Sequence, residues 1–178
     1  MTNKQINAYS AQTTLLADDS LPMQTAAGTT KRVEMGSILD CYGEIGFSGA
    51  GTDHDPTTTP EKIVDFDVEI SSTGVTASHA SNILTINSPG AYDVFVHISA
   101  AVDDSETYTL YLAKNDVEIG SAPVDIERKV GELEVIFSGF ATGLVATDTL
   151  SLWVESTNAG GAAFTPAYLK LKVSKVGV

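Results

Sequence analysis

The sequence predicts an all-β protein, a sandwich or jelly roll of short strands preceded by an extended amino-terminal arm. From Tyr42 onward, segments in which polar and apolar residues alternate recur along the chain, as in strands with one buried face. Turn-forming residues bound these segments, for example Ser88-Pro89-Gly90 and Asn158-Ala159-Gly160-Gly161. No window of comparable length has sustained helical spacing. Many short strands joined by turns are typical of sandwiches and jelly rolls.

Length and composition limit the class of protein. The 178 residues are enough for one domain and an arm, and 43% hydrophobic with 19% charged residues describe a globular chain that buries a core. Lys and Arg number 10 against 23 Asp and Glu, and the resulting net charge of −13 argues against nucleic-acid binding, which rests largely on cationic side chains. The same charge favours solubility. Cys41 is the only cysteine, so no intrachain disulfide can form.

Residues 1–40 form the expected arm. After a small, polar start they contain two extended segments, 21–24 and 32–35, on either side of a turn at Gly28, and these are expected to pair as a hairpin. An isolated two-stranded hairpin is only marginally stable in water, so the arm is expected to lie against a partner surface. A flexible tail is the alternative. The candidate attachment residues are Leu15, Leu21, Met23, Val33 and Met35.

Residues 41–178 form the expected domain. Its predicted strands span residues 42–47, 63–70, 83–87, 92–100, 108–113, 133–142, 150–155 and 168–173. In the second of these strands, the face expected to point into the core comprises Val64, Phe66, Val68 and Ile70. The face expected to point to solvent comprises Asp65, Asp67 and Glu69. The Gly- and Thr-rich segment 48–60 between the first two strands is expected to be an exposed loop.

Three short motifs occur in a recognisable order within this domain. Pro89-Gly90-Ala91-Tyr92 opens a predicted strand, Leu112-Ala113-Lys114-Asn115-Asp116 follows another, and Thr147-Asp148 precedes a third. In order and spacing, these motifs and their strands resemble the globular head of complement-type proteins, within the tumour-necrosis-factor-like (TNF-like) jelly rolls. The chain departs from that pattern at Asp116 and Thr147, where the family usually has glycine. The resemblance implies a ten-strand jelly-roll sandwich of the TNF-like type, assembled as a compact homotrimer.

The arm carries a second resemblance. Ala17-Asp18-Asp19-Ser20-Leu21-Pro22-Met23, followed by Gly28-Thr29-Thr30-Lys31-Arg32-Val33, is similar to amino-terminal segments of tailed-bacteriophage virion proteins. Such segments precede appendages or decoration modules and fasten them to the particle. The resemblance implies that the arm binds a capsid protein or another virion protein, and that the protein is located in the virion.

Some apolar residues alternate out of phase with the main apolar set of their strands. Phe95, Ile136 and Phe140 are of this kind, and His97 shares the off-phase face of its strand. A strand that is apolar on both faces is buried on both, and in a jelly roll the second burial is naturally against a neighbouring subunit. A bulge that shifts the phase by one residue is the alternative. The candidate trimer-interface residues are Phe95, His97, Ile136, Phe140 and Tyr168.

No catalytic set is recognisable, so the protein is expected not to be an enzyme. His54 lies between two aspartates in the loop 48–60, which is expected to be too flexible to hold catalytic geometry. Ser138 lacks the strand–turn–helix context of a nucleophile elbow, and Gly49-Ala50-Gly51 lacks the lysine and helix of a phosphate-binding loop.

Calcium is the one cofactor that the sequence suggests. Asp103, Asp104 and Glu106 cluster in one turn, and calcium prefers several carboxylate and carbonyl oxygens. The resemblance also implies calcium near the trimer axis in some members of the family. A solvated acidic turn is the alternative, because the chain has no Asp-x-Asp-x-Asp-Gly loop.

The expected function is that of a non-catalytic virion structural protein: a trimeric decoration or cement protein, or a head or tail appendage, attached through its arm. The alternative is a receptor- or glycan-binding module of a tail fibre, in which the loops 48–60 and 158–163 bind the host and Trp153 and Tyr111 stack on sugars. No membrane partner is expected, because no segment reaches the ~18 apolar residues of a spanning helix. Residues 1–10 lack the apolar centre of a secretory signal, so synthesis in the host cytoplasm is expected.

Overall fold

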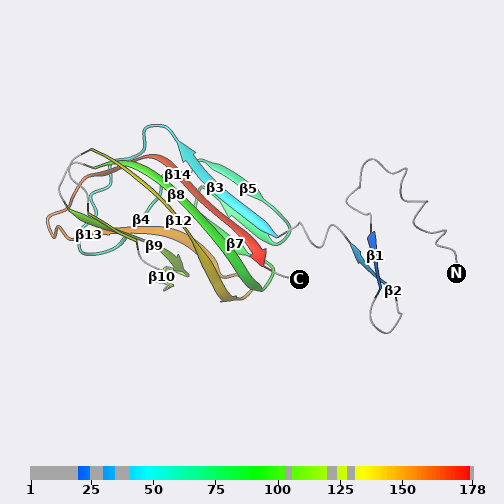
Figure 1. Ribbon diagram of the computed structural model, residues 1–178. Helices are drawn as coiled ribbons and strands as arrows, with labels where there is room; N and C mark the ends of the chain where they lie inside the picture. The colour runs from blue at the N-terminus through cyan, green and yellow to red at the C-terminus, as the bar shows by residue number, and fades with distance from the viewer. Residues whose placement is uncertain are drawn as a thin grey trace. The chain divides into compact units, whose positions relative to one another are not determined.

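The structure, a computed structural model, describes residues 20–24, 30–34, 41–102, 106–119, 124–127 and 131–176. The chain divides into two units between Asp40 and Cys41. In the first unit, β1 (Ser20–Gln24) pairs antiparallel with β2 (Thr30–Glu34), as the two extended segments of the arm predict (Figure 1). Of the candidate attachment residues, Leu21, Met23 and Val33 belong to this pair, whereas Leu15 and Met35 lie outside the described residues.

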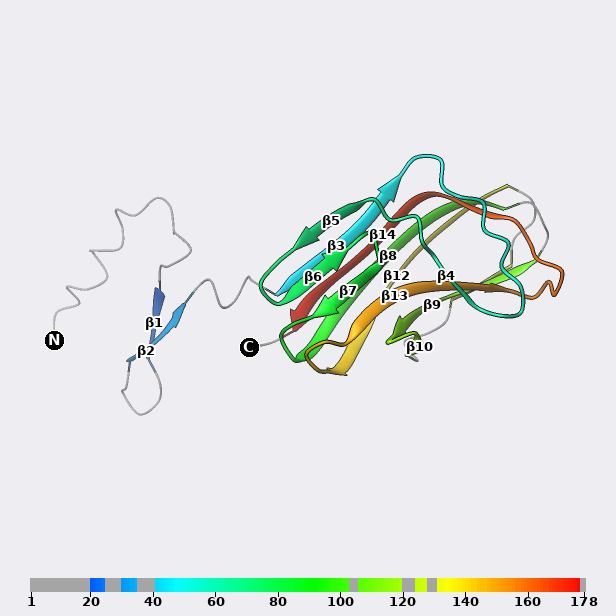
Figure 2. The same ribbon diagram turned by 180° about the vertical axis from the view of Figure 1, so that it is seen from behind.

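The second unit is a sandwich of two antiparallel sheets (Figures 1 and 2). The five-stranded sheet has the order β12 (Gly131–Leu144), β8 (Gly90–Val102), β14 (Phe164–Val176), β3 (Tyr42–Ser48) and β5 (Val68–Ser71). The seven-stranded sheet has the order β10 (Val117–Glu118), β9 (Thr107–Lys114), β13 (Thr149–Ser156), β7 (Ile83–Ile86) and β6 (Val75–Ser78). Its two further strands lie off this path: β11 (Val124–Glu127) pairs with β9, and β4 (Glu61–Lys62) pairs with β13. Among these described strands, β4 and β10 have two residues each and the other ten have four or more. The described residues contain no helix, and the all-β prediction is confirmed.

The alternation of the long strands builds the core between the two sheets. In β8, the side chains of Tyr92, Val94, Val96, Ile98 and Ala100 are 3% exposed or less, as the pattern of residues 92–100 predicts. The neighbouring strand β14 and the facing strands β9 and β13 fill the rest of the interior with Leu169, Leu171, Val173, Leu110, Leu112, Leu150, Leu152 and Val154. Full burial of a large apolar side chain stabilises the folded state by about 1.5–3 kcal/mol relative to an exposed side chain. The side chains that alternate with these point away from the core.

The strand predicted over residues 63–70 is wrong. β4 ends at Lys62 and belongs to the seven-stranded sheet, whereas β5 begins at Val68 and pairs with β3 in the five-stranded sheet. The chain crosses between the two layers over residues 63–67, so no single alternation can hold along it. Ile63 and Phe66 are buried in the crossing. The predicted core residues Val64, Val68 and Ile70 are instead exposed. The predicted solvent residue Asp65 is buried.

The two departures from the glycines of the resembled pattern, Asp116 and Thr147, lie in turns of the seven-stranded sheet. Asp116, in the turn between β9 and β10, has a φ of 61°, and Thr147, in the turn before β13, has a φ of 77°. These values lie in the left-handed region that favours glycine. The two turns are joined through Asp148, which pairs with Lys114 (2.8 Å) and accepts hydrogen bonds from the Val145 N–H and the Asn115 amide (both 2.8 Å). These contacts lower the pKa of Asp148 to about 2 against the opposing effect of its desolvation.

Candidate functional site

The outer face of the five-stranded sheet collects all five candidate interface residues. Phe95 and His97 lie on β8, Ile136 and Phe140 on β12, and Tyr168 on β14, and these three strands are neighbours in the sheet. Their side chains alternate with the core residues of the same strands and therefore point away from the core. We call the outward side chains of this sheet the outer face.

The off-phase positions of the apolar residues do not come from a bulge. The pairing of β12 with β8 is continuous from Gly131↔Val102 to Ala141↔Tyr92, and the register shifts only after Ala141. Phe95, Ile136 and Phe140 all lie within the continuous part and are 37%, 60% and 64% exposed. The alternative of a phase-shifting bulge is therefore wrong at these positions.

The sequence analysis missed a second group of exposed apolar residues on the same face. Tyr42 of β3 and Val68 and Ile70 of β5 are 39%, 56% and 43% exposed. The alternation of residues 63–70 predicts that Val68 and Ile70 lie in the core, and this prediction is wrong. The outer face thus has two apolar margins, the β12 margin (Ile136 and Phe140) and the β5 margin (Tyr42, Val68 and Ile70). Only the sheet order, which places β5 and β12 at opposite edges, identifies them as parts of one surface.

The strand register places the two margins at matching heights. One row of paired residues crosses the sheet from Ile136 through His97, Lys170 and Gly46 to Val68. Another row runs from Phe140 through Asp93 and Ser174 to Tyr42. Each row therefore begins and ends on an exposed apolar side chain.

The centre of the outer face is more polar than its margins. The rings of His97 and Tyr168 lie 4.7 Å apart, and Nε2 of His97 is 3.1 Å from Oε1 of Glu134. Nζ of Lys170 is 3.0 Å from Oε1 of Glu44, and this hydrogen bond raises the pKa of Lys170.

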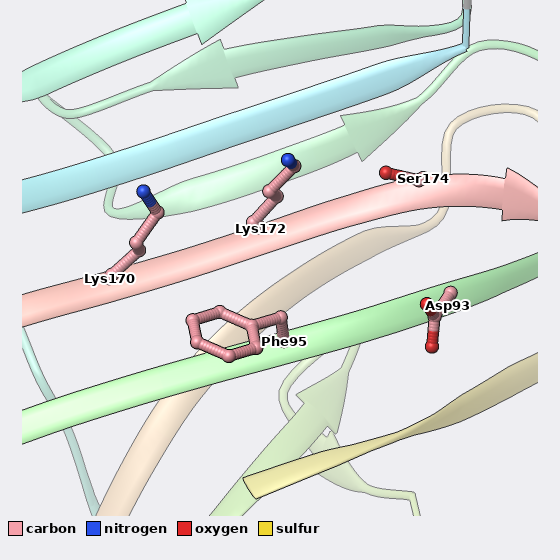
Figure 3. A pocket seen from close by; sticks show the side chains of 5 residues that line it. All are labelled: Asp93, Phe95, Lys170, Lys172 and Ser174. Carbon is pink, nitrogen blue, oxygen red and sulfur yellow. The ribbon is translucent and has the colours of Figure 1, made fainter. Parts of the chain in front are cut away.

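A pocket of about 310 Å³ lies between β8 and β14 on this face. Figure 3 shows Lys170 and Lys172 side by side on β14, with the ring of Phe95 beside them on β8. Asp93 and Ser174 complete the lining. A site with an aromatic ring and one cationic side can receive a side chain of a partner. No hydrogen bond joins a pair of its lining residues as the nucleophile and base that covalent catalysis requires.

The two loops of the alternative, recognition function are packed against each other. The N–H of Ala162 donates to the carbonyl of Pro56 (3.2 Å), and the N–H of Ser156 donates to that of Thr57 (2.9 Å). His54, predicted to lie in a flexible exposed loop, is 7% exposed, and its backbone exchanges two hydrogen bonds with that of Phe164. The expectation of an exposed loop holds for most of residues 48–60 but is wrong at His54 and Pro56, which are buried because long-range backbone pairing draws them against the sandwich.

Trp153 and Tyr111 lie side by side on the outward side of the seven-stranded sheet. Their strand positions pair directly, and their rings stack at an interplanar angle of 17° with centroids 6.5 Å apart. The indole N–H of Trp153 donates to the hydroxyl of Ser151 (2.9 Å). Tyr111 is only 6% exposed, and burial, with smaller effects from Glu155 and Glu118, raises its pKa to about 12. Trp153 is half-buried and supplies most of the accessible aromatic surface of the pair.

The calcium hypothesis falls largely outside the described residues. Asp103 and Asp104 are not described, and Glu106 accepts a hydrogen bond from the hydroxyl of Thr157 (2.9 Å). In the described part of the chain, no group of three or more His, Cys, Asp or Glu side chains is arranged to hold a metal ion.

Comparison with known proteins identifies the fold. No family model matches the sequence, and no curated protein matches it. Among solved structures, the chain is similar to the Eiger TNF of S. frugiperda, with a TM-score of 0.51 and 12% sequence identity over 79% of this chain and 96% of that one. This similarity establishes a TNF-like β-sandwich fold. No helix in the described residues has the length and apolarity to cross a bilayer.

Proposed function

We propose that the chain is a non-catalytic structural protein of a tailed-bacteriophage virion, a decoration or cement protein or a head or tail appendage. It assembles as a homotrimer through the outer face and attaches to a capsid protein or another virion protein through residues 1–40. The observation that carries the assembly is the set of large apolar side chains exposed on one face of one sheet. The virion assignment rests on the resemblance of the arm to virion proteins.

The occupant of the outer face is a second copy of the chain. Large exposed apolar patches on soluble domains mark interaction sites, and obligate oligomer interfaces are rich in apolar groups. The chain carries a net charge of −13, yet on this face Lys170 and Lys172 stand beside Glu44 and Asp93. A face with both charges can meet a copy of itself without the repulsion that the rest of the anionic surface would impose.

Three copies can close a ring only if two different surfaces meet at each contact. The two apolar margins supply such surfaces. When the three-fold axis runs parallel to the strands, rotation about it does not move a row of paired residues along the axis. Ile136 of one copy therefore meets the row that ends at Val68 on the next copy. Phe140 likewise meets the row of Tyr42. The proposed contact joins the β12 margin of one subunit to the β5 margin of its neighbour.

Cysteine cross-linking tests this contact. In a Cys41→Ser background, Ile136→Cys with Val68→Cys is expected to yield covalent trimers on oxidation, whereas each single variant should yield none. The matched control, Ile136→Cys with Tyr42→Cys, combines positions from different rows and should cross-link far less. Light scattering on the uncross-linked protein is the separate test of assembly: a monomer mass of 18.7 kDa at micromolar concentration would refute the trimer itself.

The attachment role of residues 1–40 has its own experiment. Three arms on one trimer act together, so a weak contact per arm suffices through effective concentration. A truncated protein that begins at Asp40 is expected to assemble and melt like the full chain but to fail to bind virions that lack their native copies. Equal binding by the truncated protein would locate attachment on the sandwich.

A second candidate function is host recognition through a glycan. The stacked Trp153–Tyr111 pair lies on the outward side of the other sheet, which the proposed trimer leaves free, and an aromatic surface beside Glu155 and Glu118 suits the stacking and hydrogen bonding of a sugar ring. A glycan array separates the two functions. Binding that is lost in Trp153→Ala supports recognition, and no binding by the full chain supports a decoration role.

A further inference from the structure

His54 lies in the segment between β3 and β4, at the start of β14. Its N–H donates to the carbonyl of Phe164 (3.0 Å), and its carbonyl accepts the N–H of Phe164 (2.9 Å). The imidazole meets the Phe164 ring at its edge, with centroids 6.4 Å apart. The position of the ring is therefore determined by contacts outside its own segment.

Both ring nitrogens of His54 face carboxylates. Nδ1 is 2.8 Å from Oε1 of Glu61, and Nε2 contacts Oδ2 of Asp65. A neutral imidazole has one N–H, and an ionised carboxylate only accepts, so a neutral ring can bond just one of these two partners. Both contacts can be hydrogen bonds only if His54, Glu61 and Asp65 together hold one proton more than a neutral ring between two ionised carboxylates.

The environments of the two carboxyl groups show where this proton resides. The side chain of Asp65 is 4% exposed, and its burial alone would raise its pKa. Hydrogen bonds from His54 and from the N–H of Thr52 (2.7 Å) outweigh the burial, so the pKa of Asp65 is lowered and the carboxylate stays ionised. Glu61 is 38% exposed, so water also reaches its carboxyl group. Because a carboxyl group faces each ring nitrogen, the geometry suits an imidazolium that donates to both.

We propose that His54, Glu61 and Asp65 form a proton-dependent clasp. The clasp holds the segment 51–60 against β4 and Asp65 while the ring carries both protons, and it opens when the ring loses one. The other charged groups nearby are also acidic: Asp53 accepts a hydrogen bond from the hydroxyl of Thr165 on β14 (2.9 Å), and Asp55 lies against Gly161 of the loop before β14. No Lys or Arg of the described residues forms an ion pair with any of these carboxylates. The imidazolium is the counter-charge of Glu61 and Asp65.

The clasp opens at a defined contact. After deprotonation, one nitrogen presents a lone pair to a carboxylate oxygen, and the two acceptors repel. The side chain of Asp65 is only 4% exposed, whereas that of Glu61 is 38% exposed and can turn outward. The remaining proton stays on Nε2, and the Nδ1–Glu61 contact is lost. Release of the segment from β4 follows, at the end of the sandwich where the loops 48–60 and 158–163 pack together.

Nitrogen-15 NMR of the histidines in the full-length protein tests the proton count. His79 and His97 serve as internal references, because each has one nitrogen beside one glutamate. At pH 6, both ring nitrogens of His54 are expected to carry a proton that is hydrogen-bonded to a carboxylate. A His54 ring with a bare nitrogen at pH 6 would overturn the proposal.

Hydrogen exchange tests the opening. In the full chain, amides of the segment 51–60, corrected for their intrinsic rates, are expected to exchange about tenfold faster at pH 9 than at pH 6, the loss expected for a hydrogen bond to a charged group. Glu61→Gln is the decisive variant, because its amide can donate to a neutral Nδ1 and needs no further proton. It should remove the pH dependence, whereas the exposed control Glu69→Gln should retain it. A pH dependence that persists unchanged in Glu61→Gln would overturn the clasp.

Discussion

Substitution of Phe140 by Ser tests the outer face as an assembly surface. Phe140 is 64% exposed in the single sandwich, so it packs little against its own core. An aromatic side chain buries 150–250 Å², so about 130 Å² of this one is available to a neighbouring subunit. At about 25 cal/mol per Å² this corresponds to about 3 kcal/mol per contact. The substitution is expected to weaken each contact between subunits by about 100-fold or more.

Sedimentation over a range of protein concentrations measures this loss directly. Val117→Ser is the matched control, since Val117 is 68% exposed but lies on β10 of the opposite sheet. The control is expected to assemble like the unchanged protein. The melting temperature at concentrations where all variants are monomeric should be the same, because neither side chain belongs to the core. If Phe140→Ser dissociates no more readily than Val117→Ser, the outer face is not the interface.

Three further substitutions test the sandwich itself. Gly43→Ala places a methyl group 2.3 Å from Cγ1 of Val75 on the facing sheet. It is expected to lower the free energy of unfolding, measured in urea, by about 1–3 kcal/mol. The double variant Gly43→Ala/Val75→Ala should recover part of this loss, because it removes the clashing methyl group. Thr147→Gly relieves a φ of 77° and is expected to raise the free energy of unfolding by about 0.5–1 kcal/mol; a loss of stability would show that the turn is not strained. Asp148→Asn removes a carboxylate whose pKa is lowered from 3.8 to about 2 by folding. The ionised carboxylate therefore stabilises the folded protein fully above pH 3.8, and this stabilisation is lost as the pH falls through about 2. The melting temperature of this variant should lie below that of the unchanged protein at neutral pH and converge with it near pH 2, whereas a constant difference would contradict the assignment.

The long strands and part of the outer face are predictable from local sequence. In β8, side chains alternate between the two faces of the sheet, so the phase of Tyr92, Val94 and Val96 determines both the core residues and the outward position of Phe95. The same reasoning identifies Ile136 and Phe140. These residues were accessible to sequence analysis because each lies in a stretch of continuous strand pairing that keeps one phase.

The remainder of the outer face depends on which sheet a segment joins. Residues 63–70 have the alternation of a strand, yet they leave one sheet and enter the other, so Val68 and Ile70 face outward while Ile63 and Phe66 are buried. Alternation indicates that two faces differ but does not indicate which of them meets the core when the chain changes layers.

The sequence alone determined the fold class, the phase of the long strands and the off-phase apolar residues, because each follows from neighbouring residues in one strand. Only the tertiary structure decided that His54 is buried between Glu61 and Asp65. Its segment has the composition of a loop, and its burial comes from backbone pairing with Phe164, which is 110 residues further along the chain (164 − 54). The β5 margin likewise exists only because β5 pairs with β3, at the edge of the sheet opposite to β12. Contacts between segments so distant in the sequence leave no periodic signal in either segment, which is the physical reason why sequence analysis missed them.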